Sequence, residues 1–239
     1  MKALILAAGR GSRMGHLTEE CPKCMLELAG RTLLDWQTSA LIAAGMEEIA
    51  IITGYKKEMF PPQYKQFENS RWAQTNMVSS LMCAQPWLND APCIASYSDI
   101  FYDAEAITLL AQSSADIAVL YDVNWRAQWE TRFKDPLSDA ETFRINVQGE
   151  ILEIGNRAQS LDEIQGQYIG LLRFTPKSWQ QILTVLEALG QAQVDKLSMT
   201  ELLNILICKD IKITGVPYSG LWGEADNADD LKTHEKRIA

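Results

Sequence analysis

The feature that most constrains the fold is a short apolar run near the start of the chain that leads directly into glycine-rich sequence. Residues 3–7 are apolar, and the sequence GRGSR follows at 9–13. This order predicts a buried first strand and, after it, a loop whose backbone N–H groups hold phosphates. Gly9 and Gly11 can adopt positive φ and allow a ligand to approach the main chain closely. We therefore expect an anion to bind where the first strand ends.

Two basic residues can supply side-chain charge to this anion, Arg13 within the loop and Lys23 directly after a proline. Gly9, Gly11 and Gly15 do not have the G-x-G-x-x-G spacing of a dinucleotide-binding loop, and the sequence contains no Walker loop. The alternative is a glycine-rich turn with incidental basic residues. The combination of glycines, arginine and a Pro-Lys pair favours the phosphate loop.

Length, charge and cysteine content limit the classes of protein that the chain can be. Its 239 residues suit a single domain spanning 1–239. A net charge of -9 argues against a nucleic-acid-binding surface, which needs clustered Lys and Arg. The five cysteines are an odd number and do not indicate a disulfide framework, and no stretch resembles a signal peptide or a membrane span. We expect a cytoplasmic protein that binds neither nucleic acid nor membrane.

Apolar segments alternate with amphipathic segments along most of the chain. Strands are expected at 3–7, 49–53, 94–100, 117–121, 168–174 and 211–216, and helices at 32–44, 106–111, 179–189 and 200–208. Asn76 is expected to cap a further short helix, and Asn227 or Asp229 to cap the last one. Strands separated by helices imply an α/β fold with a largely parallel sheet, which binds ligands at the carboxyl ends of its strands. The glycine loop and Asp99 both fall at that edge.

Residues 122–165 interrupt this alternation and are expected to form an insertion. The segment is polar, is rich in Trp, Arg and Asp, and contains a hairpin pattern with Gln148-Gly149 at the turn.

The segment LAAGRGSRM at 6–14, followed by the Pro-Lys pair, resembles the signature of nucleotidyltransferases that activate sugar phosphates and alcohol phosphates with a nucleoside triphosphate. The resemblance implies a Rossmann-like nucleotidyltransferase fold with a mostly parallel, mixed sheet flanked by helices. It also implies that the loop binds the triphosphate and that two cations, Arg13 and Lys23, act on the phosphates. The nucleotide-binding residues implied by the loop are Leu6, Ala7, Ala8, Gly9, Gly11 and Ser12.

Carboxylates at two distant positions match the metal ligands of this family. Asp99 lies where the family carries a metal-binding aspartate at a strand end, although Ser98 replaces the usual preceding glycine. Trp222, Glu224 and Asp226 resemble the W-x-E-x-D stretch of cytidylyltransferases of the phosphocholine-activating kind. The resemblance implies Mg²⁺ held by Asp99 and Asp226, and Mg²⁺ commonly takes one or two carboxylates together with phosphate and water. Taken alone, these carboxylates could form a turn or cap a helix.

Further matches concern the base and the acceptor. The segments at 75–77 and 79–81 resemble the base-contacting segment of this group, which implies polar contacts from Asn76 and Ser79. The insertion and the sequence IQGQYIGLL resemble phosphocholine and 2-aminoethylphosphonate cytidylyltransferases. Aromatic faces and carboxylates, including those of Asp139 and Glu141, suit an ammonium group. The expected acceptor-binding residues are Asp122, Trp125, Trp129, Tyr168, Trp222 and Glu224.

The sequence therefore predicts a Mg²⁺-dependent cytidylyltransferase that uses CTP and a small phosphorylated or phosphonate amino-alcohol, either phosphocholine or 2-aminoethylphosphonate. An ionised phosphate nucleophile needs no general base, so neither His16 nor His234 is assigned to catalysis. Two alternatives remain open, a sugar-1-phosphate nucleotidyltransferase and a non-catalytic nucleotide-binding protein. No feature of the sequence indicates an oligomeric state.

Overall fold

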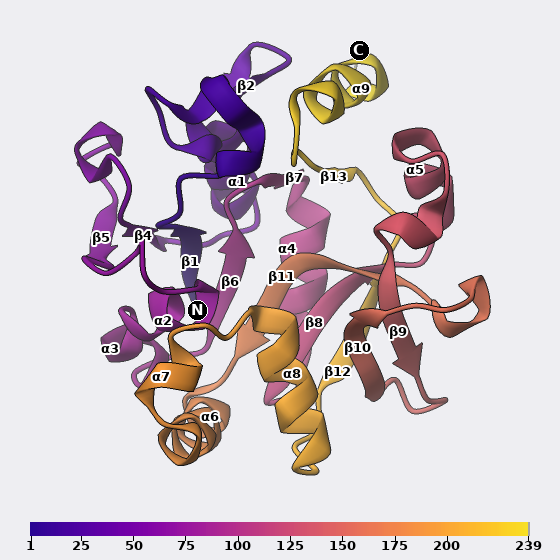
Figure 1. Ribbon diagram of the computed structural model, residues 1–239. Coiled ribbons are helices and arrows are strands. Elements are labelled where there is room, and N and C mark those ends of the chain that lie inside the picture. Colours follow the sequence, from indigo (N-terminus) through magenta and orange to yellow (C-terminus); the bar gives the residue numbers. More distant parts are fainter. Residues whose placement is uncertain (239) are drawn as a thin grey trace.

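A seven-stranded sheet forms the centre of the molecule in the computed structural model, which describes residues 1–238 (Figure 1). In spatial order its strands are β12 (Thr214–Tyr218), β8 (Ile117–Asp122), β11 (Gln167–Phe174), β6 (Cys93–Tyr97), β1 (Lys2–Ala7), β4 (Glu48–Thr53) and β5 (Lys65–Glu68). Only β11 runs antiparallel to its neighbours. The predicted mixed, mostly parallel sheet is confirmed.

The first strand lies in the interior of this sheet, between β4 and β6. Leu4 is paired in register with Ala50 on one side and Ala95 on the other. Residues 3–8 are all buried, because helices cover both faces of the sheet. The glycine-rich loop therefore leaves the sheet at its carboxyl edge, beside the end of β6.

Two layers of helices complete the core, one on each face of the sheet. Alternate residues of β1 contribute to the two sides, with Leu4 and Leu6 on one and Ile5 on the other. The first layer consists of α2 (Met77–Met82), α3 (Gln85–Leu88), α6 (Pro176–Leu189), α7 (Gln191–Val194) and α8 (Met199–Cys208). The second consists of α1 (Leu33–Ala43), α4 (Ala104–Gln112) and α5 (Trp125–Arg132).

Local sequence explains where several of these elements begin and end. Thr32 and Asp35 form a reciprocal capping box at the start of α1. Gly45, after the end of α1, has a φ of 83° that favours glycine. Asn76 caps α2, as expected, and accepts a hydrogen bond from the N–H of Met77. Short 3₁₀ segments occupy Ser12–Thr18, Lys23–Met25, Lys57–Met59, Pro136–Ser138 and Leu161–Glu163.

The predicted strand at 94–100 is wrong at its end, and the difference shapes the site. β6 stops at Tyr97, and the chain turns through Ser98 and Asp99 into β7 (Ile100–Tyr102). Ile100 was assigned to the strand at 94–100 because it is apolar, but it begins β7, which is also buried. β7 forms a two-stranded sheet with β13 (Trp222–Glu224). Glu224 pairs with Ile100, and the N–H of Ala225 donates to the carbonyl oxygen of Asp99. The late part of the chain is thus joined to the turn that carries Asp99.

The segment at 122–165 contains α5 and the expected hairpin, formed by β9 (Glu141–Ile145) and β10 (Ile151–Arg157). Gly149 in its turn has a φ of 80°, which agrees with the expected turn. The hairpin residues Phe143 and Ile154 belong to the same buried cluster as α8. The hairpin therefore packs against α8 in the first layer of helices, whereas α5 belongs to the second layer.

Near the C-terminus, β12 begins at Thr214 rather than at the expected Ile211. Asn227, not Asp229, caps the last helix, α9 (Ala228–Ile238), because its side-chain oxygen accepts from the N–H groups of Asp229 and Asp230. Figure 1 shows α9, in yellow, at the same end of the molecule as the indigo segments that follow β1.

The remaining short strands are β2 (Glu27–Leu28) and β3 (Arg31–Thr32). Within 1–238, no helix has both the length and the apolar character needed to cross a membrane.

Candidate active site

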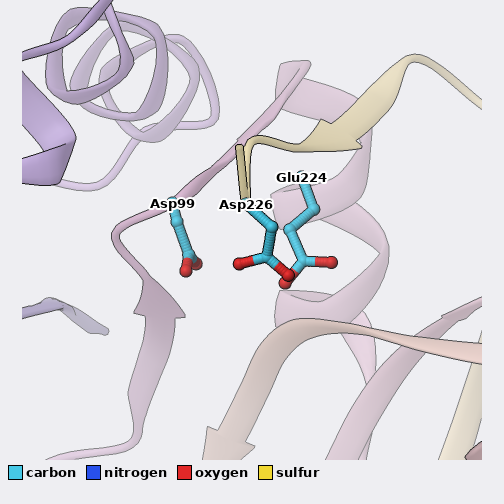
Figure 2. Close-up of side chains that lie close together, drawn as sticks. All are labelled: Asp99, Glu224 and Asp226. Carbon is cyan, nitrogen blue, oxygen red and sulfur yellow. The ribbon is translucent and has the colours of Figure 1, made fainter. Parts of the chain in front are cut away.

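Three carboxylates from two distant segments converge at the carboxyl edge of the sheet. Asp99 lies in the turn after β6, Glu224 ends β13, and Asp226 follows two residues later. Figure 2 shows the three side chains directed toward one another from these two segments. One oxygen of each carboxylate lies within 4.8 Å of the others. The antiparallel pairing of β7 with β13 produces this convergence.

The two basic side chains that were predicted to contact phosphate lie against the same carboxylates. The Nζ atom of Lys23 is 2.9 Å from Oδ2 of Asp99 and 2.9 Å from Oδ1 of Asp226. The Nη1 atom of Arg13 is 2.9 Å from Oδ2 of Asp226. Lys23 is buried, whereas the Arg13 side chain is exposed. The structure therefore brings together all four residues that the sequence assigned to phosphate and metal chemistry.

The electrostatics of the cluster follow from burial and mutual attraction. Burial by itself lowers the pKa of Lys23, but attraction to Asp99 and Asp226 outweighs it, and the net pKa is raised. Burial opposes ionisation of Asp226, yet Lys23 and Arg13 lower its pKa overall. Burial and the neighbouring Asp226 and Asp99 raise the pKa of Glu224. Additional positive charge among the carboxylate oxygens would therefore stabilise the ionised form of the cluster.

These residues fit a small divalent cation. Oδ1 of Asp99 is buried and has no hydrogen-bond partner among residues 1–238, so it is free to act as a ligand. Carboxylate oxygens are the hard ligands that Mg²⁺ prefers, and at its bond length of 2.0–2.1 Å opposite ligands are about 4 Å apart. The observed spread of up to 4.8 Å is close to that separation. Asp99 and Asp226, with Glu224 beside them, could hold such an ion.

A cavity of about 190 Å³ adjoins the carboxylates on the side of the glycine-rich loop. Of the predicted nucleotide-binding residues, those that line it are Leu6, Ala8, Gly9, Gly11 and Asn76, together with Arg13 and Lys23. Asp99 lines it too, so a bound ligand would meet the candidate metal site.

Three predicted nucleotide-binding residues lie outside this cavity. Ala7 faces the opposite side of the sheet, Ser12 is exposed, and Ser79 donates to the carbonyl oxygen of Val194 at the end of α7. Ser80 lines the cavity in place of Ser79, because successive residues of a helix point about 100° apart. Trp72, Thr75 and Tyr97 also line the cavity but were not predicted from the sequence. Of these, Thr75 lies in the segment at 75–77 that resembles the base-contacting segment of the family.

The close approach of Lys23 favours glycine at position 11. The φ of Gly11 is +74°, and a Cβ atom built there would lie 2.8 Å from both Cβ and Cδ of Lys23. A larger residue would therefore strain the loop and displace the lysine. At Gly9 a Cβ atom would meet nothing within 4 Å, so the chain itself does not demand glycine there.

A second cavity, of about 320 Å³, adjoins the first, and Arg13, Met77 and Tyr97 line both. Four predicted acceptor-binding residues line this second cavity, namely Trp129, Tyr168, Trp222 and Glu224. Asp139 and Glu141 line it as well. Its walls thus combine aromatic faces with carboxylates, the composition expected for a site that binds a cation.

Two predicted acceptor-binding residues, Asp122 and Trp125, do not line this cavity. Asp122 is buried behind Trp222 and accepts a hydrogen bond of 2.9 Å from its indole N–H. Trp125 is also buried and packs edge-on against Trp129 at a centroid distance of 6.0 Å. Both assignments are corrected: these residues support the wall from behind. The helical spacing correctly placed the two tryptophans on one face, but only Trp129 reaches the cavity.

The fold and the site define a nucleotidyltransferase. Residues 3–195 match the family described as the MobA-like NTP transferase domain, and the chain belongs to this family. It is 33% identical to a CTP:phosphoglutamine cytidylyltransferase of Campylobacter jejuni over 97% of this chain and 98% of that protein. It is 32% identical to a 2-aminoethylphosphonate cytidylyltransferase of Lancefieldella rimae over 44% of this chain and 45% of that protein.

A solved structure shows the same fold. The CTP:phosphocholine cytidylyltransferase from Streptococcus pneumoniae superposes with a TM-score of 0.75 at 19% identity, covering 100% of this chain and 99% of that one. The expected Rossmann-like nucleotidyltransferase fold is therefore confirmed.

Proposed function

We propose that this protein is a Mg²⁺-dependent cytidylyltransferase that joins CMP from CTP to a small phosphate or phosphonate carrying an ammonium group, with release of pyrophosphate. One observation carries the proposal. The carboxylate cluster lies where two cavities meet, because Asp99 lines the first and Glu224 lines the second. A triphosphate in the first cavity and an acceptor in the second would meet at these carboxylates.

The reaction follows from the charges at this junction. An ionised oxygen of the acceptor attacks the α-phosphorus of CTP, a new P–O bond forms, and the bond to the β-phosphate breaks so that pyrophosphate leaves with the electron pair. Lys23 stabilises the charge that develops on the α-phosphate, and Arg13 holds the departing pyrophosphate. Mg²⁺, when bound by Asp99 and Asp226, supplies positive charge to the phosphate oxygens. Because the nucleophile is already ionised, positioning replaces general-base catalysis.

Substrate binding changes the partners of the two cations. Without a ligand, Lys23 and Arg13 both contact Asp226. Phosphate oxygens that enter the first cavity compete for the same N–H donors. Lys23 then faces the substrate and leaves carboxylate oxygens of Asp99 and Asp226 available to a cation.

The walls of the second cavity support an acceptor with a primary ammonium. Trp129 and Trp222 lie side by side, with centroids 6.2 Å apart and rings inclined at 40°, and Tyr97 and Tyr168 also line the cavity. Aromatic faces suit either kind of ammonium group, whereas hydrogen-bond acceptors favour a primary one. Asp139 and Glu141 supply carboxylates, and no side-chain partner is assigned to the Glu141 carboxylate within the described chain. The two similar proteins found by sequence are named for phosphoglutamine and 2-aminoethylphosphonate, which supports an acceptor of this kind and CTP as donor, whereas the structural neighbour is named for phosphocholine.

A pyrophosphate-release assay across nucleotides and acceptors tests this function. CTP, UTP and ATP are each combined with phosphoethanolamine, phosphocholine, 2-aminoethylphosphonate, phosphoglutamine and glucose-1-phosphate. We expect CTP to be preferred, and phosphoethanolamine to be used better than phosphocholine, from which it differs only by three methyl groups. Equal use of UTP with glucose-1-phosphate would assign the protein to the sugar-phosphate enzymes. Tight CTP binding without turnover on any acceptor would instead indicate a nucleotide-binding protein.

A further inference from the structure

A third cavity, of about 370 Å³, lies between α5 and α9, which Figure 1 shows at the same end of the molecule. The side chains around it come from these two helices, from the end of β8 and from the segment that leads from β12 into β13. Among residues 1–238, this α5–α9 cavity has no lining residue in common with the first cavity and shares only Trp222 with the second. The proposed reaction makes no use of it.

The α5–α9 cavity contains a buried side-chain amide with an unused donor. Gln128, on α5, lines the cavity and is 8% exposed, and its Nε2 atom is buried without a hydrogen-bond partner among residues 1–238. Its Oε1 atom accepts a hydrogen bond from Nη1 of Arg237, which determines which end of the amide is the donor. Because a buried N–H without an acceptor is unfavourable, an oxygen atom supplied by a ligand would stabilise this arrangement.

Arg237, on α9, lines the same cavity from its exposed rim. Its Nη1 atom donates to Gln128 and lies 3.3 Å from Nδ1 of His234. No partner within the described chain is assigned to its Nε and Nη2 atoms. Partial burial lowers the pKa of Arg237, and attraction to Asp122 offsets this effect only in part. An anion bound beside the guanidinium would therefore stabilise its charge.

The other charged groups around the cavity already have partners. Nε of Arg132 donates to Oδ1 of Asp230 at 2.9 Å. The Asp122 carboxylate accepts from the indole N–H of Trp222 at 2.9 Å and from the backbone N–H of Asn124 at 2.7 Å. The negative charge of Asp122 limits the affinity for an anion, but its oxygens do not occupy the unused amide and guanidinium donors.

We propose that the α5–α9 cavity is a second binding site, whose ligand carries a phosphate group. A phosphate oxygen accepts from Nε2 of Gln128, and Arg237 donates to the same group through Nε and Nη2, the paired geometry that suits an oxyanion. The hydroxyl groups of Ser219 and Thr233 line the cavity and supply further donors. This site goes beyond the proposed reaction, since Trp222 forms a wall between it and the acceptor cavity.

The test is a calorimetric titration of the full chain with inorganic phosphate at constant ionic strength. The protein is first saturated with CTP in the presence of EDTA, so that the first cavity is occupied and no metal-dependent transfer takes place. Arg237→Gln is compared with the matched variant Lys236→Gln, which removes the same charge from the neighbouring position of α9. Lys236 is exposed and does not line the cavity. A parallel titration with acetate measures binding of a carboxylate.

We expect wild type to bind one equivalent of phosphate and Arg237→Gln to bind it at least about tenfold more weakly, the usual effect of losing a hydrogen bond from a charged group. Lys236→Gln should stay within about twofold of wild type, as for other surface substitutions. Acetate should bind more weakly than phosphate, because it carries a single charge. Absence of phosphate binding to wild type, or equal weakening by the two variants, would overturn the inference. Binding of acetate as tight as that of phosphate would contradict the assigned ligand class.

A second variant, Gln128→Met, removes the unused amide donor and keeps the length of the side chain. It should also weaken phosphate binding, and unchanged affinity in the folded variant would contradict the part assigned to Gln128. These titrations measure no product, so their outcome is independent of whether the protein transfers CMP. A wild-type protein that binds phosphate in this way but forms no CMP-linked product would contradict the proposed reaction alone.

Discussion

The ammonium of Lys23 lies 2.9 Å from the carboxylate of Asp226, although 203 residues separate them in the chain. The lysine follows the loop that leaves β1, and the aspartate follows β13, which reaches the site only through its pairing with β7. The contact therefore joins the region after the glycine-rich loop to the segment between β13 and α9. In the proposed reaction, catalysis therefore depends on the same ion pair that helps to hold the segment after β13 in place.

Removal of the lysine charge should abolish most of the turnover while the protein stays folded. We expect Lys23→Met, which keeps the aliphatic stem against Gly11, to lower kcat by about 10²- to 10³-fold, as for other groups that stabilise transition-state charge. Asp99→Asn should give a loss of similar size. Steady-state kinetics and circular dichroism check the pair, and near wild-type turnover in either folded variant would remove that residue from the mechanism.

The two loop glycines should respond differently to alanine. Gly11→Ala should lower the free energy of unfolding by about 1–3 kcal/mol, the range for a non-glycine residue held at positive φ, and should weaken CTP binding because it displaces Lys23. Gly9→Ala should change stability by less than about 0.5 kcal/mol, since the new methyl group meets no protein atom. Urea unfolding and calorimetric CTP titration measure both effects. Equal destabilisation by the two variants would contradict the described loop.

Substitution of the two neighbouring tryptophans should have different effects, one on acceptor binding and the other on core packing. Trp129→Leu removes an aromatic face from the second cavity and should raise the acceptor KM roughly tenfold, the equivalent of about 1.4 kcal/mol, with little change in the KM for CTP. Trp125→Leu should mainly lower the melting temperature, because Trp125 is buried outside the cavity. If Trp125→Leu raised the acceptor KM as much as Trp129→Leu does, the corrected assignment of Trp125 would fail.

Stability should fall on the acid side of neutrality because of His234. Burial lowers the pKa of His234 to about 4, with Arg237 and Arg132 acting in the same direction, while the carbonyl of Glu224 and the carboxylate of Asp230 oppose the shift. In the unfolded chain the pKa is about 6.5. Between pH 6.5 and 4 the unfolded state therefore binds more protons, so this contribution to stability is complete above pH 6.5 and is lost as pH falls to 4.

The variant His234→Gln removes this titration and keeps an N–H donor near the Glu224 carbonyl. Its unfolding free energy should vary less steeply than that of wild type between pH 6.5 and 4, with a difference of at most about 3.4 kcal/mol across the window. Denaturant titrations at several pH values measure the two slopes. Identical slopes would show that His234 does not carry the predicted depressed pKa.

Local sequence was sufficient to predict the sheet and the glycine-rich loop, and the resemblance to nucleotidyltransferases singled out the four charged residues that the structure brings together at the sheet edge. The strand at 3–7 and the loop after it could be recognised because the residues that define them are neighbours in the sequence. The position of Asp122 could not be obtained this way, because whether the end of β8 faces the cavity or the back of Trp222 depends on how distant elements pack. The same holds for the Arg132–Asp230 pair, whose members are 98 residues apart and belong to no recognisable pattern.

The proposed metal-dependent transfer is tested most directly by ³¹P NMR of the wild-type protein with CTP, phosphoethanolamine and Mg²⁺, and again with EDTA in place of Mg²⁺. We predict that the signals of pyrophosphate and of a CMP-linked diphosphate diester grow together in equal amounts, and that neither forms with EDTA. Product formation at the same rate without a divalent cation would contradict the metal site of Asp99 and Asp226. Release of pyrophosphate without a CMP-linked product would contradict transfer to the acceptor.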